Sequence, residues 1–173
     1  GHRGGEVASA LAVQTTREVV KQSFEKESGV SPRDLLARAY REANRRIFDL
    51  SQNQAELKGM GTTMVSCLSR DNSLFFGNVG DSRVYMCREG QLWQLTEDHS
   101  LIYEQIRAGH LKEAEASQLV AKNIITRSVG FEPDVNCDVV VRKLQSKELY
   151  LLCSDGLSGL VQDKRICEIM STE

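Results

Sequence analysis

Short apolar segments joined by tight turns fill residues 64 to 95 and limit the folds open to this chain. The segments have the length of β-strands and lie at 64–68, 74–79, 84–87 and 92–95. The residues between them, Asp71-Asn72-Ser73, Gly80-Asp81 and Glu89-Gly90, are typical of turns. Parallel neighbours would need long crossover connections, for which these turns leave no room. The pattern therefore predicts an antiparallel meander and disfavours a parallel, doubly wound sheet.

Two amphipathic helices are expected before the strands. From Glu6 to about Glu27 the spacing of three to four residues predicts a helix whose inner face holds Val7, Leu11, Thr15, Val19 and Phe24. A second helix should begin at Ser31, which can cap it, and Pro32, which suits its first turn. Its inner face is expected to hold Leu35, Ala39, Ala43, Ile47 and Leu50.

The second half of the chain mixes helical and strand patterns. A helical stretch from Ser100 to about Lys122, with Gly109 as a stop, is followed by expected strands at 135–141 and 149–153. A last helix is expected at 163–170, with Asp163 as its cap. This order predicts an α+β domain in which segregated helices cover antiparallel sheets. A length of 173 residues fits one domain, so we assign residues 1–173 to a single domain.

Composition excludes several classes of protein. The net charge of −2 gives no basic field that would attract nucleic acid. No apolar run approaches the ~18 residues that span a bilayer, and no signal peptide opens the chain, so we expect a cytoplasmic protein with no membrane segment in this stretch. The five cysteines form no C-x-x-C pair and lie in or beside apolar runs, which predicts buried thiols in a reducing compartment.

Two aspartates follow strand-like segments at turns that contain glycine. Asp155 follows 149–153 and precedes Gly156, and Asp81 follows Gly80 at the end of another apolar segment. A carboxylate at a rigid strand end, where glycine allows a close approach, suits a hard cation such as Mg²⁺ or Mn²⁺. Ordinary turn chemistry explains either aspartate taken alone, and nothing in their spacing links the two.

Four blocks of the sequence resemble, in order, the signature blocks of the bacterial type 2C family of metal-dependent serine/threonine protein phosphatases. They are 1–9 (GHRGGEVAS), 59–63 (GMGTT), 77–83 (GNVGDSR) and 151–157 (LLCSDGL). Residues 95–100 (LTEDHS) and 123–130 (NIITRSVG) resemble the segments that bound the mobile flap of that family. The resemblance implies two stacked antiparallel β-sheets flanked by helices, an αββα sandwich that is incomplete here, with a flap subdomain at 97–129.

The resemblance also implies a mechanism and its residues. In that family two Mg²⁺ or Mn²⁺ ions hold a bridging water that attacks the phosphorus directly. By the match of the blocks, Asp155 is a ligand of the core metals and Asp81 is the ligand of a third, more weakly held ion. His2 is a candidate to protonate the leaving alkoxide or contact the substrate, and a solvated histidine explains it equally well. The implied partners are phosphorylated proteins, the targets of a serine/threonine kinase.

The match breaks off at both ends. The chain starts at the last glycine of the family's Asp-Gly-Met-Gly-Gly and stops before the Asp-Asn pair that supplies another ligand. We therefore expect a partial domain, either a fragment of a normal enzyme or a protein whose other parts are supplied elsewhere. Little activity is expected of these 173 residues alone, and open sheet edges favour a dimer or a domain swap.

Other functions remain compatible with these residues. A catalytically inactive phosphatase-like module would bind phosphoproteins or regulate a kinase pathway. An unrelated metal hydrolase would use His99 and His110, although their spacing fits no helical ligand pair of the H-E-x-x-H kind. We interpret Arg83, Arg127 and Ser154 as residues that brace loops through backbone or carboxylate groups, rather than as substrate contacts.

Overall fold

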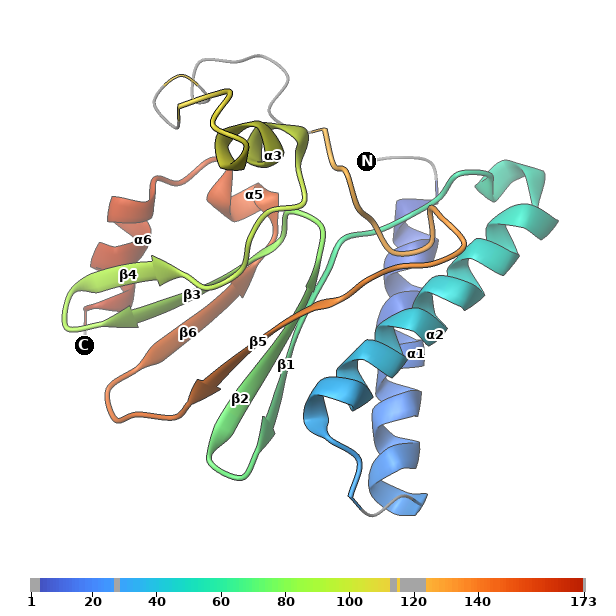
Figure 1. Cartoon of the computed structure of the whole chain (residues 1–173), viewed down its shortest axis with the longest axis horizontal. Helices are drawn as coiled ribbons and strands as arrows, with labels where there is room; N and C mark the ends of the chain where they lie inside the picture. Colours follow the sequence, from blue (N-terminus) through green and yellow to red (C-terminus); the bar gives the residue numbers. More distant parts are fainter. Residues whose placement is uncertain (1–3, 27–28, 113–114, 116–123, 173) are drawn as a thin grey trace.

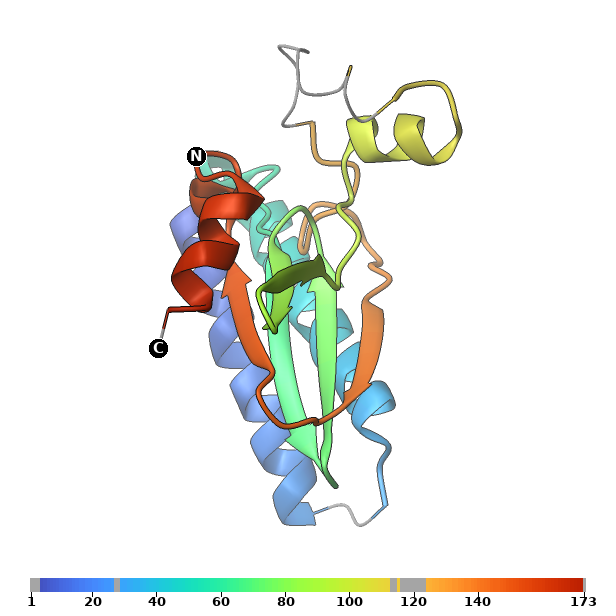
Figure 2. The ribbon, with the colours of Figure 1, turned by 90° about the vertical axis from the view of Figure 1, so that its left-hand side faces the viewer.

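Two three-stranded antiparallel sheets lie face to face in this protein, with helices on both outer sides (Figures 1 and 2). The computed structural model describes residues 4–26, 29–112, 115 and 124–172. One sheet has the strand order β1-β2-β5 and the other β4-β3-β6. The expected α+β sandwich is therefore confirmed.

The labels of the elements follow Figure 1. In chain order they are helix α1 (Gly5–Lys26), helix α2 (Pro32–Asn53), the 3₁₀ turn η1 (Ala55–Leu57), strands β1 (Met64–Arg70), β2 (Ser73–Val79), β3 (Arg83–Arg88) and β4 (Gln91–Gln94), helix α3 (Leu101–Arg107), strands β5 (Asp138–Lys143) and β6 (Leu149–Cys153), and helices α5 (Asp155–Ser158) and α6 (Asp163–Met170).

The two long helices pack against each other and cover the β1-β2-β5 sheet (Figure 1). Small side chains allow a close approach of the helices, and the buried ones are Ala8, Ala12, Ala39 and Ala43. The prediction of the buried face of α1 is wrong at the C-terminal end of the helix. Phe24 is 59% exposed, because Ser23 takes the buried position in that turn.

Helix α2 begins as the sequence predicted and is anchored to the sheet. The Ser31 hydroxyl accepts a hydrogen bond from the Asp34 backbone N–H at 3.1 Å, which caps the helix. The buried Tyr40 hydroxyl donates to the Gly77 carbonyl of β2 at 2.9 Å. A Cβ at residue 77 would lie 2.9 Å from the Tyr40 ring, so the glycine makes room for this contact.

The predicted meander is wrong at its centre, because consecutive strands β2 and β3 lie in different sheets. β2 pairs with β5, and β3 pairs with β6. The chain crosses between the sheets at Gly80, whose φ is +105°. A Cβ at this position would lie 2.4 Å from the Thr63 side chain, so only glycine fits. Asp81 consequently lies at the junction of the two sheets.

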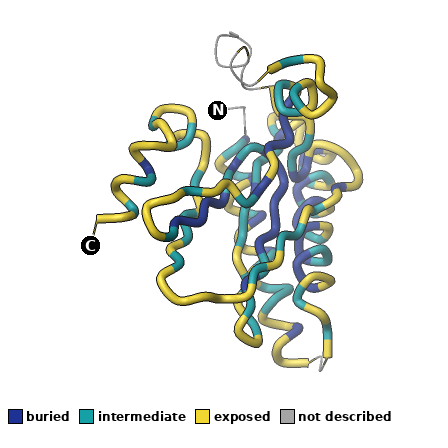
Figure 3. Tube along the Cα trace, turned by 60° about the vertical axis from the view of Figure 1, so that its left-hand side comes forward, coloured by how far each residue is buried: buried dark blue, intermediate teal, exposed yellow. Residues whose placement is uncertain are grey.

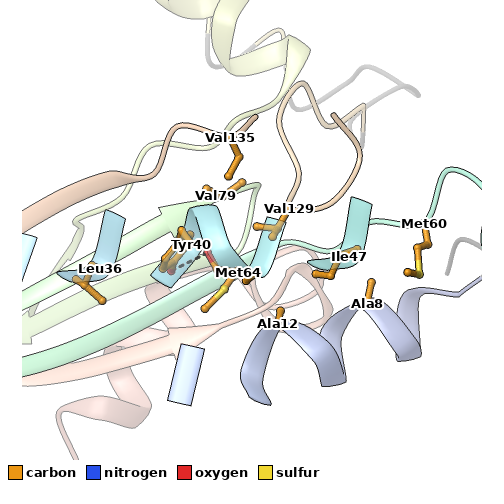
Figure 4. Packing of buried hydrophobic residues seen from close by; sticks show 11 residues of the cluster. Ala8, Ala12, Leu36, Tyr40, Ile47, Met60, Met64, Val79, Val129 and Val135 are labelled. Carbon is orange, nitrogen blue, oxygen red and sulfur yellow. Dashed lines mark hydrogen bonds between the residues drawn. The ribbon is translucent and has the colours of Figure 1, made fainter. Parts of the chain in front are cut away.

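The core has two parts. The larger one fills the space between α1, α2 and the first sheet, and Figure 4 shows its members, which are Ala8, Ala12, Leu36, Tyr40, Ala43, Ile47, Met60, Met64, Val79, Val129 and Val135. The smaller one lies between the sheets, where the Phe76 and Tyr150 rings are 5.3 Å apart. Burial is deepest in β2, β3 and the inner side of α2, whereas β6 and α6 are largely exposed or half-buried (Figure 3).

Several expected boundaries move. β5 begins at Asp138 rather than Val135, because Val135 is buried in the larger core cluster instead of pairing. Asp163 is the first residue of α6 and not its cap, which is Gln162. The helical stretch after Ser100 gives α3, and most of its expected second part lies outside the described residues.

The expectation of five buried thiols is also wrong. Cys87 alone is buried; Cys137, Cys153 and Cys167 are half-buried, and Cys67 is exposed. Cys67 lies on the face of β1 opposite to Met64 and Leu68, which pack into the core beneath α1 and α2. No helix in the described part of the chain is both long and apolar enough to cross a bilayer.

Candidate active site

The pairing of β3 with β6 brings the two predicted aspartates together. Its register places Arg83 opposite Cys153. The ladder ends at this pair, so Asp81, two residues before Arg83, and Asp155, two residues after Cys153, lie at the same end of the paired strands. Asp81 lies just before β3, and Asp155 lies just after β6 as the first residue of α5. Strand pairing thus supplies the link that sequence spacing could not.

The electrostatics of this pair favour a cation. Burial and the negative charge of Asp155 raise the pKa of Asp81 above its ordinary value. Among the side chains that the structure describes, neither carboxylate forms an ion pair. A divalent cation bound between them would remove this repulsion.

A third carboxylate nearby, Asp98, is already paired. Arg83 donates from Nε and Nη2 to Asp98 at 2.9 and 2.6 Å, and from Nη1 to the Tyr85 hydroxyl at 2.9 Å. Burial acts to lower the pKa of Arg83, but these hydrogen bonds raise it above the ordinary value. The prediction that Arg83 braces a loop is confirmed, and Asp98 is not free to bind a metal.

The donor set fits part of a site for Mg²⁺ or Mn²⁺. Both ions prefer oxygen ligands, and Mg²⁺ usually keeps several waters beside one or two carboxylates. Asp81 and Asp155 supply two such ligands. No group of three or more His, Cys, Asp or Glu side chains that could hold an ion is present among the described residues. The other ligand positions are therefore left to water, phosphate oxygens or side chains outside that part of the chain.

Three of the four signature blocks lie against one another, and the second also pairs with Val129 of the segment that closes the proposed flap. Thr62 forms a β-bridge with Val129, and the Thr63 hydroxyl lies 2.9 Å from that of Ser82. Gly4, at φ +78°, packs against the segment that precedes Gly61. A Cβ on Gly4 would lie 3.1 Å from the Met60 side chain. The first block, from Gly4 onward, is thus placed beside the second.

The candidate His2 lies outside the described residues, so its role stays a prediction. His99 and His110 do not form a metal site, as both ring nitrogens of His99 have partners and His110 is exposed. Sequence reasoning did not identify Asp138, which accepts a hydrogen bond from Arg127 Nη1 at 2.9 Å and lies 3.1 Å from His99 Nε2. The resemblance of residues 95–100, which include His99, to a family segment was the sequence feature that could have indicated the group formed by His99, Arg127 and Asp138.

Arg127 braces the loop before β5, as predicted. Besides Asp138, its Nη1 donates to the Asn136 carbonyl at 3.1 Å. Burial acts to raise the pKa of Asp138, but hydrogen bonds with His99 and Arg127 lower it below the ordinary value. Asp138 therefore stays ionised and holds both partners in place.

Comparison with known proteins decides the family. The family model "Protein phosphatase 2C" matches residues 1–105. Serine/threonine phosphatase stp from Listeria monocytogenes serotype 4b is 36% identical over 173 residues, which are 100% of this chain and 69% of that protein. The chain belongs to the protein phosphatase 2C family.

Solved phosphatase structures share the fold. Stp1 from Staphylococcus aureus superposes with a TM-score of 0.87 at 33% identity, over 100% of this chain and 68% of Stp1. The catalytic domain of the phosphatase PstP, solved in complex with 2 manganese ions, gives a TM-score of 0.84 at 32% identity, over 100% of this chain and 70% of that catalytic domain. Protein phosphatase 2C enzymes are metal-dependent serine/threonine protein phosphatases, in agreement with the paired carboxylates.

Proposed function

We propose that this phosphatase removes phosphate from phosphoserine and phosphothreonine in proteins, using divalent metal bound by Asp81 and Asp155. The observation that carries the proposal is the pairing of β3 with β6, which brings the aspartates of two signature blocks to the same end of the paired strands. The repulsion that raises the pKa of Asp81 supports the same assignment. Family membership supports the class of reaction.

Each residue of the site has a distinct task in this proposal. A bound divalent metal would lower the pKa of a water and polarise the phosphoryl oxygens. Asp81, just before β3, and Asp155, just after β6, would hold the metal. Gly80 lets the chain turn between the sheets, and Arg83 keeps Asp98 occupied. His2 remains the candidate that protonates the leaving alkoxide.

The metal content is proposed as two core ions, Mn²⁺ or Mg²⁺, with Asp155 among their ligands, and a third ion at Asp81. The PstP complex with 2 manganese ions supports the core pair, and it favours testing Mn²⁺ first. The substrates would be products of a serine/threonine kinase. A cytoplasmic location and association of two copies of the chain stay predictions.

The flap at 97–129 also stays a proposal. Its two ends are joined, because Ser100 forms a β-bridge with Ile125 and the Leu101 N–H donates to the Ile124 carbonyl at 2.9 Å. Joined ends support a single insertion that enters and leaves the fold at one place. That place is next to Gly80, as the His99 N–H donates to the Gly80 carbonyl at 3.0 Å.

Hydrolysis of a phosphothreonine peptide by the full-length protein tests the proposed function. Phosphate release should require Mn²⁺, stop on chelation and return when Mn²⁺ is added in excess. Asp155→Asn removes one carboxylate charge from the metal site and should reduce turnover by about 10²-fold or more. Asp71→Asn is the matched control, since Asp71 is exposed in the β1–β2 turn at φ 49°, a conformation that asparagine tolerates.

Two results would contradict the proposal. Turnover that survives chelation would exclude a metal-activated water. Tight binding of the phosphopeptide without release of phosphate, in the presence of Mn²⁺, would favour the non-catalytic phosphatase-like module instead.

A further inference from the structure

His99 holds the residue next to Asp81 at two points. The Gly80 N–H donates to His99 Nδ1 at 2.9 Å, and the His99 backbone N–H donates to the Gly80 carbonyl at 3.0 Å. The histidine is only 7% exposed, so these bonds are shielded from water. Both hydrogen-bonding groups of the Gly80 backbone are thus satisfied by one residue.

The turn that presents Asp81 is anchored on its other side as well. The Ser82 hydroxyl lies 2.9 Å from the Thr63 hydroxyl. Asp81 therefore sits between two fixed neighbours, one held by His99 and the other by Thr63. The direction of its side chain follows from how these neighbours are held.

The His99 ring is itself held in one orientation. Because Nδ1 accepts from Gly80, the proton of the neutral ring lies on Nε2, which donates to Asp138 Oδ2 at 3.1 Å. Arg127 Nη1 donates to the other oxygen of the same carboxylate at 2.9 Å. The His99 carbonyl accepts from the Thr126 N–H at 2.9 Å. One residue thus joins the end of the proposed flap, the start of β5 and the turn at Gly80.

We propose that His99 is a positioning residue that holds the Asp81 turn in its metal-binding conformation by accepting the Gly80 N–H. The inference rests on the proposed role of Asp81 as a metal ligand. His99 is not a ligand itself, since both of its ring nitrogens are occupied by protein groups. Its action is on the geometry of the neighbouring carboxylate, as for residues that orient ligands in other metal sites.

Two substitutions of His99 separate this role from a purely structural one. In His99→Asn the amide oxygen lies near the position of Nδ1, so it can still accept from Gly80, but it cannot reach Asp138. In His99→Gln the longer amide reaches toward Asp138, and the acceptor for Gly80 is lost. The positioning role predicts weaker Mn²⁺ binding only in the glutamine variant, by about tenfold. The asparagine variant should stay within about twofold of the unsubstituted protein.

Mn²⁺ binding is measured from the electron paramagnetic resonance signal of free Mn²⁺ during a titration, and does not depend on activity. The Mn²⁺ concentration for half-maximal phosphopeptide turnover should shift in parallel, while turnover at saturating Mn²⁺ changes little. Thermal unfolding of each metal-free variant reports the fold. His110→Gln is the control, because His110 is exposed and lies outside the site.

The outcomes are decisive in each direction. Unchanged Mn²⁺ affinity in folded His99→Gln, or an equal loss in both variants, would overturn the inference. If Asp81→Asn also leaves Mn²⁺ affinity unchanged, the metal role of Asp81 fails, whereas a loss in Asp81→Asn alone refutes only the role of His99. If His99→Gln does not fold, hydrogen exchange at the Gly80 amide of the unsubstituted protein is measured instead. Mg²⁺ should slow the exchange of this amide. An exchange rate that Mg²⁺ does not change would refute the inference.

Discussion

The surroundings of Asp81 differ from those of an ordinary surface carboxylate. Asp81 is half-buried and forms no ion pair with the described side chains, and burial together with the negative charge of Asp155 raises its pKa. A folded-state pKa above the unfolded value means that ionisation of Asp81 opposes folding. The penalty is complete above the raised pKa and disappears as the pH falls toward the ordinary aspartate range.

The first prediction concerns Asp81→Asn in metal-free protein. At neutral pH the variant should unfold about 1 to 2 °C higher than the unsubstituted chain, because the repulsion is removed. The difference should shrink as the pH falls through the raised pKa of Asp81. With Mn²⁺ present the order should reverse, because the variant loses a metal ligand. Calorimetry with and without Mn²⁺ across this pH range measures both effects, and a variant less stable in metal-free protein at every pH would contradict the prediction.

At the scale of elements, the decisive feature is the change of sheet between β2 and β3. Each hairpin, β1 with β2 and β3 with β4, is what the turn residues between its strands predict. The segment between the hairpins contains the same kind of turn residues but leads into another sheet. Gly80 allows this, as its φ of +105° and its close approach to Thr63 exclude any side chain.

The second prediction compares Gly80→Ala with Gly90→Ala. Both glycines have positive φ, at +105° and +72°, but nothing lies within 4 Å of a Cβ at Gly90. Gly90→Ala should therefore cost only the backbone strain of about 1 to 2 kcal/mol. Gly80→Ala adds a clash with Thr63 and should cost about 3 kcal/mol or more. Denaturant unfolding of both variants measures these costs. Equal losses of the free energy of unfolding would show that a clash with Thr63 does not destabilise Gly80→Ala.

At the scale of the whole molecule, apolar side chains on the outer strands remain exposed. Val141 of β5 is 42% exposed, and Leu149 and Leu152 of β6 are 41% and 38% exposed. Both strands are at the edge of their sheets among the described strands. Unpaired backbone groups next to exposed apolar side chains favour pairing with another chain.

The third prediction is that two copies of this chain associate through these strands. Light scattering after size-exclusion chromatography should give a mass above that of the 19.3 kDa chain, rising with concentration. Leu149→Lys should weaken association, because a lysine on an edge strand must be desolvated when the edge pairs. Leu160→Lys is the control, since Leu160 is 83% exposed but lies outside the strands. A mass equal to that of one chain at all concentrations would contradict this prediction.

The sequence by itself determined the kinds of elements, the cap of α2 and the signature blocks, because helix period, strand alternation and turn chemistry are local properties. Strands β1, β2, β3, β4 and β6 and both long helices lie where these patterns predicted. The burial of individual residues was less predictable. Phe24 and Cys67 are exposed, because burial depends on which other elements cover a residue.

Only the tertiary structure decided which strands pair and, with them, the meeting of Asp81 and Asp155. The two residues are far apart in the chain, and their encounter depends on β3 leaving β2 to pair with β6 in one particular register. The choice between neighbouring and distant strands is made by how the helices and sheets bury their apolar faces together. The same packing places His99 behind Gly80, a contact that no local pattern around either residue could indicate.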